Sequence, residues 1–116
     1  MEVICEMMKL KPERVNDYID LHNNTWPEIV TATREAGMVE EYVYILDNIV
    51  MVIMKCENFN ETCLKLANVE IVKDWDDKVR EMLISDETFF HTKDVLLDLE
   101  PVWRLDNFDG KGVLKF

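Results

Sequence analysis

Two apolar runs in the middle of the chain lie only two residues apart, and this spacing constrains the fold more than any other feature. The runs cover residues 39–46 and 49–56, and Asp47 and Asn48 lie between them. β-branched and aromatic residues are frequent in both runs, which favours strands, and a two-residue connection is typical of a tight hairpin. The second run is almost entirely apolar, as in a strand covered on both faces. The sequence therefore predicts a central antiparallel pair.

A strand and a helical region precede this hairpin. Residues 2–9 alternate as a strand does, and Pro12 fits the first turn of a helix. Pro27 interrupts the helical pattern that follows, because proline disrupts a continuous helix. A second helical segment is therefore expected over roughly 26–36.

Both ends of this second segment carry helix-end signals. Thr25 and Glu28 have the spacing of a capping box, in which each side chain bonds the backbone of the other residue. Gly37 fits the C-terminal end of the segment, where glycine accepts a left-handed backbone.

The part of the chain after the hairpin mirrors the part before it. Apolar residues recur at helical spacing after Asn58 or Asn60, with a possible break near Asn68. Residues 84–94 are expected to form a loop, and residues 95–104 alternate again as a closing strand.

The resulting order, β-α-β-β-α-β, is the ferredoxin-like arrangement of the α+β class. Both helical regions then cover one face of a four-stranded sheet and leave the other face open. Because that open face is rich in large side chains, a second copy of the chain is expected to cover it as a homodimer with sheets face to face. The space between sheet and helices can then hold a pocket for a small molecule.

Composition excludes several classes of function. The chain has 116 residues, which is one domain over 1–116, with the tail from about residue 106 unassigned. The net charge of −11 argues against nucleic acid and against anionic membranes as partners. No apolar run reaches the roughly 20 residues of a membrane helix, and the first residues do not resemble a signal peptide. The three cysteines are expected to be reduced thiols in a cytoplasmic protein.

The first candidate site lies on the first helical region. Tyr18 and His22 are four residues apart and therefore project from one helix face, with Trp26 nearby. An imidazole suits proton transfer near neutral pH, so His22 is a candidate acid or base with the Tyr18 phenol as a second donor. A packed histidine at a helix end is the plainer alternative.

Other candidates are less specific. Trp75 could stack on the apolar face of a sugar while Asp76 binds hydroxyl groups, or Trp75 could be a core residue with a solvated acidic neighbour. Tyr42 and Tyr44 share one strand face and could belong to a pocket or to an interface. Glu28 could also act as an acid or a base, but its place in the capping box is the simpler interpretation.

The chain contains no phosphate-binding glycine loop, no nucleophile-elbow motif and no paired-cysteine motif. The only other histidine, His91, lies far from His22 in the sequence, so no metal site is expected. His91 itself fits a solvated loop position.

One set of residues is distributed over about residues 1–105. Its core motif is fairly specific and continues into the first strand of the hairpin, a later helix and the closing strand. The residues are Tyr18-x-x-x-His22-Asn23-x-x-Trp26-Pro27-Glu28, then Gly37, Tyr42, Leu46-Asp47, Trp75 and Leu99-Glu100-Pro101-Val102-Trp103. This pattern resembles the L-rhamnose mutarotase family.

The resemblance implies a dimeric α+β barrel that interconverts the α and β anomers of a 6-deoxy sugar such as L-rhamnose, with no metal and no organic cofactor. His22 matches the proton donor of the family, and Tyr18, Tyr42 and Trp75 match its sugar-binding positions. Asp76 departs from the pattern, because bacterial rhamnose enzymes of the family often carry a second tryptophan there. The preferred sugar is therefore left open.

Mutarotation opens a hemiacetal, rotates the C1–C2 bond and closes the ring on the other face. It needs one acid and one base, each worth roughly 10²–10⁴-fold in rate. We expect His22 to supply the acid, with Tyr18, Tyr42, Glu28, Asp76 or water as the base and with Trp75 and Trp26 stacking on the sugar. The alternatives are a non-catalytic sugar-binding dimer and another small enzyme, such as a monooxygenase, on the same scaffold.

Overall fold

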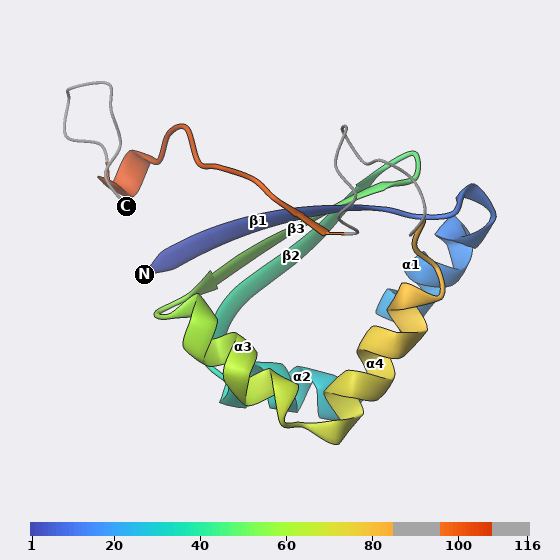
Figure 1. The fold of residues 1–116 in the computed structure, drawn as a ribbon, viewed down its shortest axis with the longest axis horizontal. Coiled ribbons are helices and arrows are strands. Elements are labelled where there is room, and N and C mark those ends of the chain that lie inside the picture. The colour runs from blue at the N-terminus through green and yellow to red at the C-terminus, as the bar shows by residue number, and fades with distance from the viewer. Residues whose placement is uncertain (85–95, 108–116) are drawn as a thin grey trace.

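The computed structural model describes residues 1–84 and 96–107 and confirms the predicted order of strands and helices (Figure 1). Two short 3-10 turns, Pro12–Arg14 and Leu105–Asn107, accompany the regular elements. These elements are β1 (Glu2–Lys9), α1 (Val15–Asn23), α2 (Pro27–Glu35), β2 (Met38–Leu46), β3 (Ile49–Cys56), α3 (Phe59–Ala67), α4 (Glu70–Arg80) and β4 (Leu96–Asp98).

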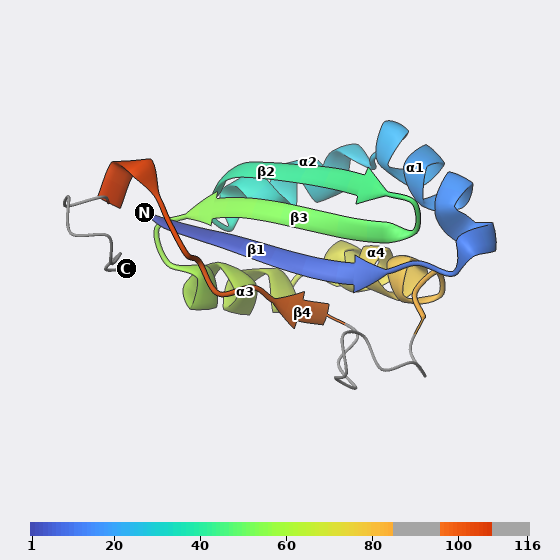
Figure 2. The same cartoon turned by 90° about the horizontal axis from the view of Figure 1, so that it is seen from above.

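The four strands form one sheet in the order β2-β3-β1-β4, and each neighbouring pair is antiparallel. The helices lie together on one face of this sheet (Figures 1 and 2). This strand order and this single helical layer confirm the ferredoxin-like α+β fold. None of the described helices has the length and apolar character needed to cross a membrane.

The central strand β3 shows how the sheet is covered. Its residues alternate between fully buried and half-buried, and the buried set faces the helices. Val50 is completely buried in this layer. The expectation that β3 is covered on both faces is met on the helical side only, because no described helix lies over the other face of the sheet (Figure 2).

The open face carries large apolar side chains, as predicted. Tyr42 and Tyr44 both lie on it and expose 48% and 58% of their surface. Ile53 of β3 pairs with Tyr42 and lies between it and β1, so the apolar surface continues across the sheet.

The hairpin turn is the predicted two-residue connection. Leu46 pairs with Ile49, which leaves only Asp47 and Asn48 in the turn. Asp47 has φ 55°, in the left-handed region that aspartate tolerates better than most residues. The residue types at the turn therefore match the backbone that a tight hairpin requires.

The capping box predicted for α2 is wrong. Trp26, not Thr25, is the residue that precedes the helix, and no side chain caps it. Pro27 occupies the first turn, which places Thr25 one residue too early to cap. The Thr25 hydroxyl instead donates to the backbone carbonyl of His22, at 2.5 Å, and satisfies a carbonyl at the end of α1.

Gly37 ends the α2 segment as predicted, with φ 108°. A side chain there would be strained, and its Cβ would lie 3.2 Å from Oγ1 of Thr62 on α3.

The second helical region begins at Asn58, whose side chain accepts from the backbone N–H of Glu61. It breaks at Asn68, which confirms the two-helix division.

The closing strand is shorter than predicted. Within the described residues β4 ends at Asp98, and one further bond, from the Leu99 N–H to the Cys5 carbonyl, continues the ladder. Pro101 has no N–H to donate and Val102 is 86% exposed, so the alternation up to residue 104 does not form a strand. Most of the expected loop 84–94, with His91, and Val95 lie outside the described residues.

Candidate active site

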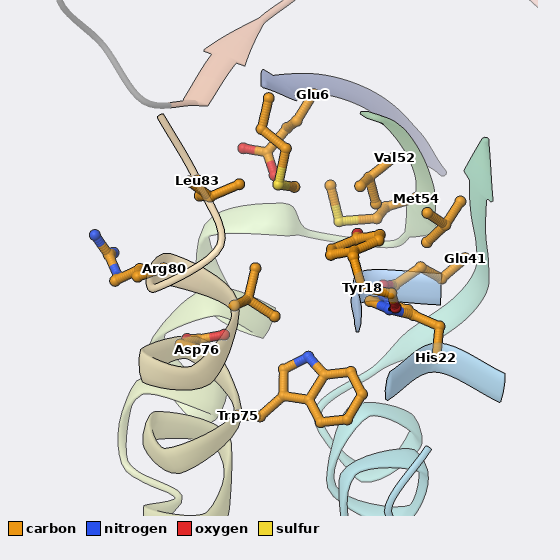
Figure 3. A pocket seen from close by; sticks show the side chains of 13 residues that line it. Glu6, Tyr18, His22, Glu41, Val52, Met54, Trp75, Asp76, Arg80 and Leu83 are labelled. Atoms are coloured by element: carbon orange, nitrogen blue, oxygen red, sulfur yellow. The ribbon is translucent and has the colours of Figure 1, made fainter. Parts of the chain in front are cut away.

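A cavity of about 540 Å³ lies between the inner face of the sheet and helices α1 and α4 (Figure 3). Its floor and walls include apolar side chains of β1, β3 and α4. The polar side chains that line it are Glu6, Tyr18, His22, Glu41, Asp76 and Arg80, and Trp75 forms an aromatic wall.

Tyr18 and His22 lie side by side in this cavity, as their spacing predicts. Their ring centroids are 4.2 Å apart. Tyr18 is 2% exposed, and burial followed by the charge of Glu41 raises the pKa of its phenol strongly. The phenol therefore stays protonated and acts as a hydrogen-bond donor.

The backbone of α1 fixes the orientation of the His22 ring. Nδ1 lies 2.9 Å from the carbonyl oxygen of Tyr18. Because a carbonyl only accepts, Nδ1 carries the hydrogen, and Nε2 is the nitrogen with a free lone pair. Burial lowers the pKa of His22, and the bond to the Tyr18 carbonyl offsets part of this shift. Near neutral pH the ring is therefore a neutral base.

Two tryptophans form the aromatic wall. Trp75 meets the His22 ring edge-on at 5.2 Å between centroids. Trp26 packs perpendicular to Trp75 at 5.1 Å. Trp75 lines the cavity, whereas Trp26 is not among the lining residues and supports Trp75.

Asp76 and Arg80 lie one turn apart on α4, and both line the cavity. Partial burial raises the pKa of the Asp76 carboxyl, the positive charge of Arg80 lowers it, and Asp77 raises it further. The positive charge of Arg80 thus offsets part of the free-energy cost of ionising Asp76 in this partly buried place.

The structure does not bring Tyr42 into the cavity. Tyr42 pairs with Ile53 on the outer face of β3, whereas its neighbour Glu41 pairs with Met54 on the inner face. The cause is a β-bulge between Met38 and Glu40, which adds one residue to β2 and reverses the alternation after it. Had the strand continued regularly from buried Met38, Tyr42 would face inward.

Sequence reasoning missed Glu41 for the same reason. The available signal was the adjacent pair Glu40-Glu41 inside a strand, because one residue of such a pair must face the helices. Glu41 stays accessible through the open side of the cavity. The surrounding protein still desolvates its carboxylate, and this effect, with the charge of Asp76, raises its pKa.

A further carboxyl was missed on β1. Glu6 lines the cavity and pairs across the sheet with Asp98 of β4. Burial, a hydrogen bond with Asp98 and the charges of Asp98 and Glu41 raise the pKa of Glu6 to about 7. A hydrogen bond between two carboxyl groups requires a proton on one of them, so this pair holds a proton up to near-neutral pH.

The remaining candidates lie away from the cavity or form no site. Glu28 is exposed on α2. In the described part of the chain, no three His, Cys, Asp or Glu side chains are arranged to hold a metal ion.

Comparison with known proteins agrees with the fold and gives the family of the chain. The family model for L-rhamnose mutarotase matches residues 3–105. A curated L-rhamnose mutarotase from Burkholderia ambifaria (strain MC40-6) is 29% identical over 77 residues, which cover 65% of this chain and 73% of that protein.

Solved structures show the same architecture. The crystal structure of an L-rhamnose mutarotase from Formosa agariphila matches with a TM-score of 0.71 and 25% identity, over 90% of this chain and 99% of that chain. Tetracenomycin F2 cyclase from Streptomyces glaucescens matches with a TM-score of 0.54 and 15% identity, over 90% and 98% of the two chains, and shows the fold alone. Because the family model spans nearly the whole chain, this chain belongs to the L-rhamnose mutarotase family, whose members are isomerases of sugar anomers.

Proposed function

We propose that the protein interconverts the α and β anomers of a 6-deoxy sugar such as L-rhamnose, by proton transfer alone and without a cofactor. The observation that carries this proposal is the placement of His22 and Tyr18 at one end of a cavity walled by Trp75. A volume of about 540 Å³ suits a small molecule such as a monosaccharide.

Ring opening moves two protons at neighbouring oxygens. The ring oxygen gains a proton as its bond to C1 breaks, and the anomeric hydroxyl loses one as it becomes a carbonyl. Rotation about the C1–C2 bond and the reverse transfers give the other anomer. The reaction therefore requires two proton-transfer groups that face one sugar, and side chains can supply both.

We propose His22 as one of these two groups. Its free Nε2 suits proton exchange, because Nδ1 is occupied by the Tyr18 carbonyl. The resemblance predicts His22 as the first donor, but the lowered pKa favours the neutral ring. His22 then begins as the base at the anomeric hydroxyl and acts as the acid when the ring closes.

The other lining groups suit the binding of a sugar. The flat face of Trp75 offers a surface for the apolar C–H face and the C6 methyl group, and Trp26 holds that ring in place. The Tyr18 phenol donates to a sugar oxygen, and the Asp76 carboxylate accepts from a sugar hydroxyl. Tyr42 lies on the opposite sheet face, so in this chain it has no direct role in the cavity.

We also propose that two copies of the chain associate through their open sheet faces. The exposed side chains of Tyr42 and Tyr44 and the half-buried Ile53 form an apolar surface that a self-complementary partner would cover. This surface is separate from the cavity, which lies on the helical side of the sheet.

NMR exchange measurements with free sugars, led by L-rhamnose and L-fucose, test the proposed activity. Saturation of one anomer should reduce the signal of the other when the protein is present. His22→Ala should lower the exchange rate roughly 10²–10⁴-fold. Asp20→Asn, an exposed change on the same helix, is the control and should retain the rate. The absence of saturation transfer between anomers with every sugar tested, or binding without exchange, would contradict the proposal.

A further inference from the structure

We propose that Glu41 is the second acid/base residue of the cavity, and that it exchanges a proton with the ring oxygen while His22 serves the anomeric hydroxyl. This inference rests on the proposed mutarotase function and deepens it, because it names the group that completes the proton-transfer pair.

The register of the sheet places Glu41 in the site. The β-bulge in β2 turns Glu41 towards the helices and directs its pairing to Met54, which is buried and lines the same cavity. Glu41 therefore faces the sugar site from the sheet, whereas His22 faces it from α1. Two groups on different elements can reach two different oxygens of one bound sugar.

The polar groups that line the cavity with Glu41 come from three elements, and the Arg80 side chain points away from Glu41 (Figure 3). From α1 these are a phenol and an imidazole, from α4 a carboxylate with an arginine one turn later, and from β1 another carboxyl. They are Tyr18, His22, Asp76, Arg80 and Glu6. β3 contributes only apolar side chains to this part of the cavity.

Among the carboxyl groups in the cavity, Glu41 differs in having neither a cation that offsets its charge nor a hydrogen bond that occupies its proton. Asp76 has the positive charge of Arg80 nearby, and Glu6 shares a hydrogen bond with Asp98. In the part of the chain that the structure describes, no ion pair or hydrogen bond involves the Glu41 side chain. Burial and then the charge of Asp76 raise the pKa of Glu41, so its carboxyl is shifted towards the protonated form without a hydrogen bond that would hold the proton.

This arrangement assigns different roles to the two acidic residues. The charge of Arg80 favours the ionised form of Asp76, and the charge of Asp76 adds to burial in raising the pKa of Glu41. Tyr18 does not replace Glu41, because a phenol whose pKa is raised gives up its proton too reluctantly to transfer it. Tyr18 is therefore a fixed donor, and Glu41 is the mobile acid.

Glu41 and His22 together account for every proton that the reaction moves. On opening, Glu41 gives its proton to the ring oxygen as the bond to C1 breaks, and Nε2 of His22 takes the proton of the anomeric hydroxyl. The products are the open-chain aldehyde, a Glu41 carboxylate and a His22 imidazolium. On closure His22 protonates the new anomeric oxygen, and Glu41 recovers its proton from the attacking hydroxyl.

The test compares Glu41→Gln with Glu40→Gln by NMR exchange on the full chain. Glutamine has the shape of glutamate but carries no exchangeable acid, so Glu41→Gln should lower kcat about 100-fold and change KM little. Glu40 is adjacent, lies on the opposite sheet face and pairs with Lys55, so Glu40→Gln should keep the wild-type rate.

The pH profile separates proton transfer from a structural role. Wild-type kcat should fall on the alkaline side as Glu41 ionises, and this limb should disappear in Glu41→Gln. Glu41→Asp retains a carboxyl group, so it should recover part of the rate and restore the limb. One-dimensional proton spectra of each variant confirm that it is folded.

Three outcomes would overturn the assignment: wild-type kcat in Glu41→Gln, a raised KM with unchanged kcat, or equal losses in Glu41→Gln and Glu40→Gln. Each of these presupposes an active wild type. An inactive wild-type protein would instead contradict the proposed function itself, so the two failures are distinguishable.

Discussion

The two faces of the sheet differ although they are built from alternating residues of the same strands. The inner face presents carboxyl groups and small or flexible apolar side chains to a cavity, and Glu41 is its acidic representative on β2. The outer face presents the exposed rings of Tyr42 and Tyr44. We thus propose that adjacent residues of one strand serve proton chemistry on one side and association on the other. The period-2 geometry of a strand keeps these two tasks separate.

The largest expected effect comes from placing a charge in the outer face. Ile53→Glu adds a carboxylate at the centre of the proposed interface, and in a self-complementary dimer it does so twice. Burying these charges without partners should weaken association by about 1,000-fold or more. Light scattering coupled to size-exclusion chromatography should then give the mass of one chain.

Lys73 is an exposed residue of α4, and Lys73→Gln makes the same change of net charge, so this variant is the control. It should leave the mass at that of two chains. A wild-type protein that elutes as a monomer at all concentrations would contradict the proposed role of the outer face in association.

A smaller effect is expected from removing one hydroxyl group from each face. Tyr18→Phe loses a donor in the cavity and should lower kcat/KM about tenfold, the usual magnitude for one hydrogen bond to a substrate. Tyr42→Phe, on the outer face, should leave kcat/KM unchanged. Exchange rates measured over a range of sugar concentrations give both values.

The variants Tyr18→Phe and Tyr42→Phe can also contradict the proposed difference between the two faces. A loss of rate in Tyr42→Phe that matches the loss in Tyr18→Phe would mean that the outer face contributes to a sugar site. The separation of tasks between the two faces would then be wrong.

The smallest expected effect concerns stability against pH. The pKa of Glu6 is raised from 4.5 in an unfolded chain to about 7 by burial and by its hydrogen bond with Asp98. The contribution of Glu6 is therefore fully present below pH 4.5 and is lost as the pH rises through about 7. Because the site is partly open to solvent, the loss should be on the order of 1 kcal/mol.

Urea unfolding of wild type and Glu6→Gln at several pH values measures this loss. Glutamine stays neutral, so the variant should be less sensitive to pH between 4.5 and 7 than wild type, and the difference between the two curves isolates Glu6. Parallel curves would show that the bond between β1 and β4 does not depend on this proton.

Much of the fold follows from local patterns. The two-residue hairpin turn, the stop at Gly37 and the break at Asn68 were all predictable, because each depends on a residue type with a strong backbone preference. The closing strand was overestimated, because alternation continues past Asp98 while Pro101 cannot take part in the ladder.

The site was only partly predictable. Helical spacing places Tyr18 beside His22, because the helix repeat is regular over these few residues. The identity of the β2 residue in the cavity could not be read from the sequence, because one extra residue in the strand reverses every later position. The electrostatic interaction between Glu41 and Asp76 depends on the tertiary arrangement by which β2 and α4 line one cavity, which no local pattern encodes.

The bulge in β2 also has a consequence for how such a pocket can be remodelled. Val39 is the extra residue, so deleting it would leave Glu40 paired with Lys55 and every later pair of β2 unchanged, with Glu41 still in the cavity and Tyr42 still on the outer face. The deletion would change only the local bend and twist that a bulge gives to a strand. The shape of β2 at the edge of the pocket can thus be altered by one residue of length while the side chains that line the pocket stay the same.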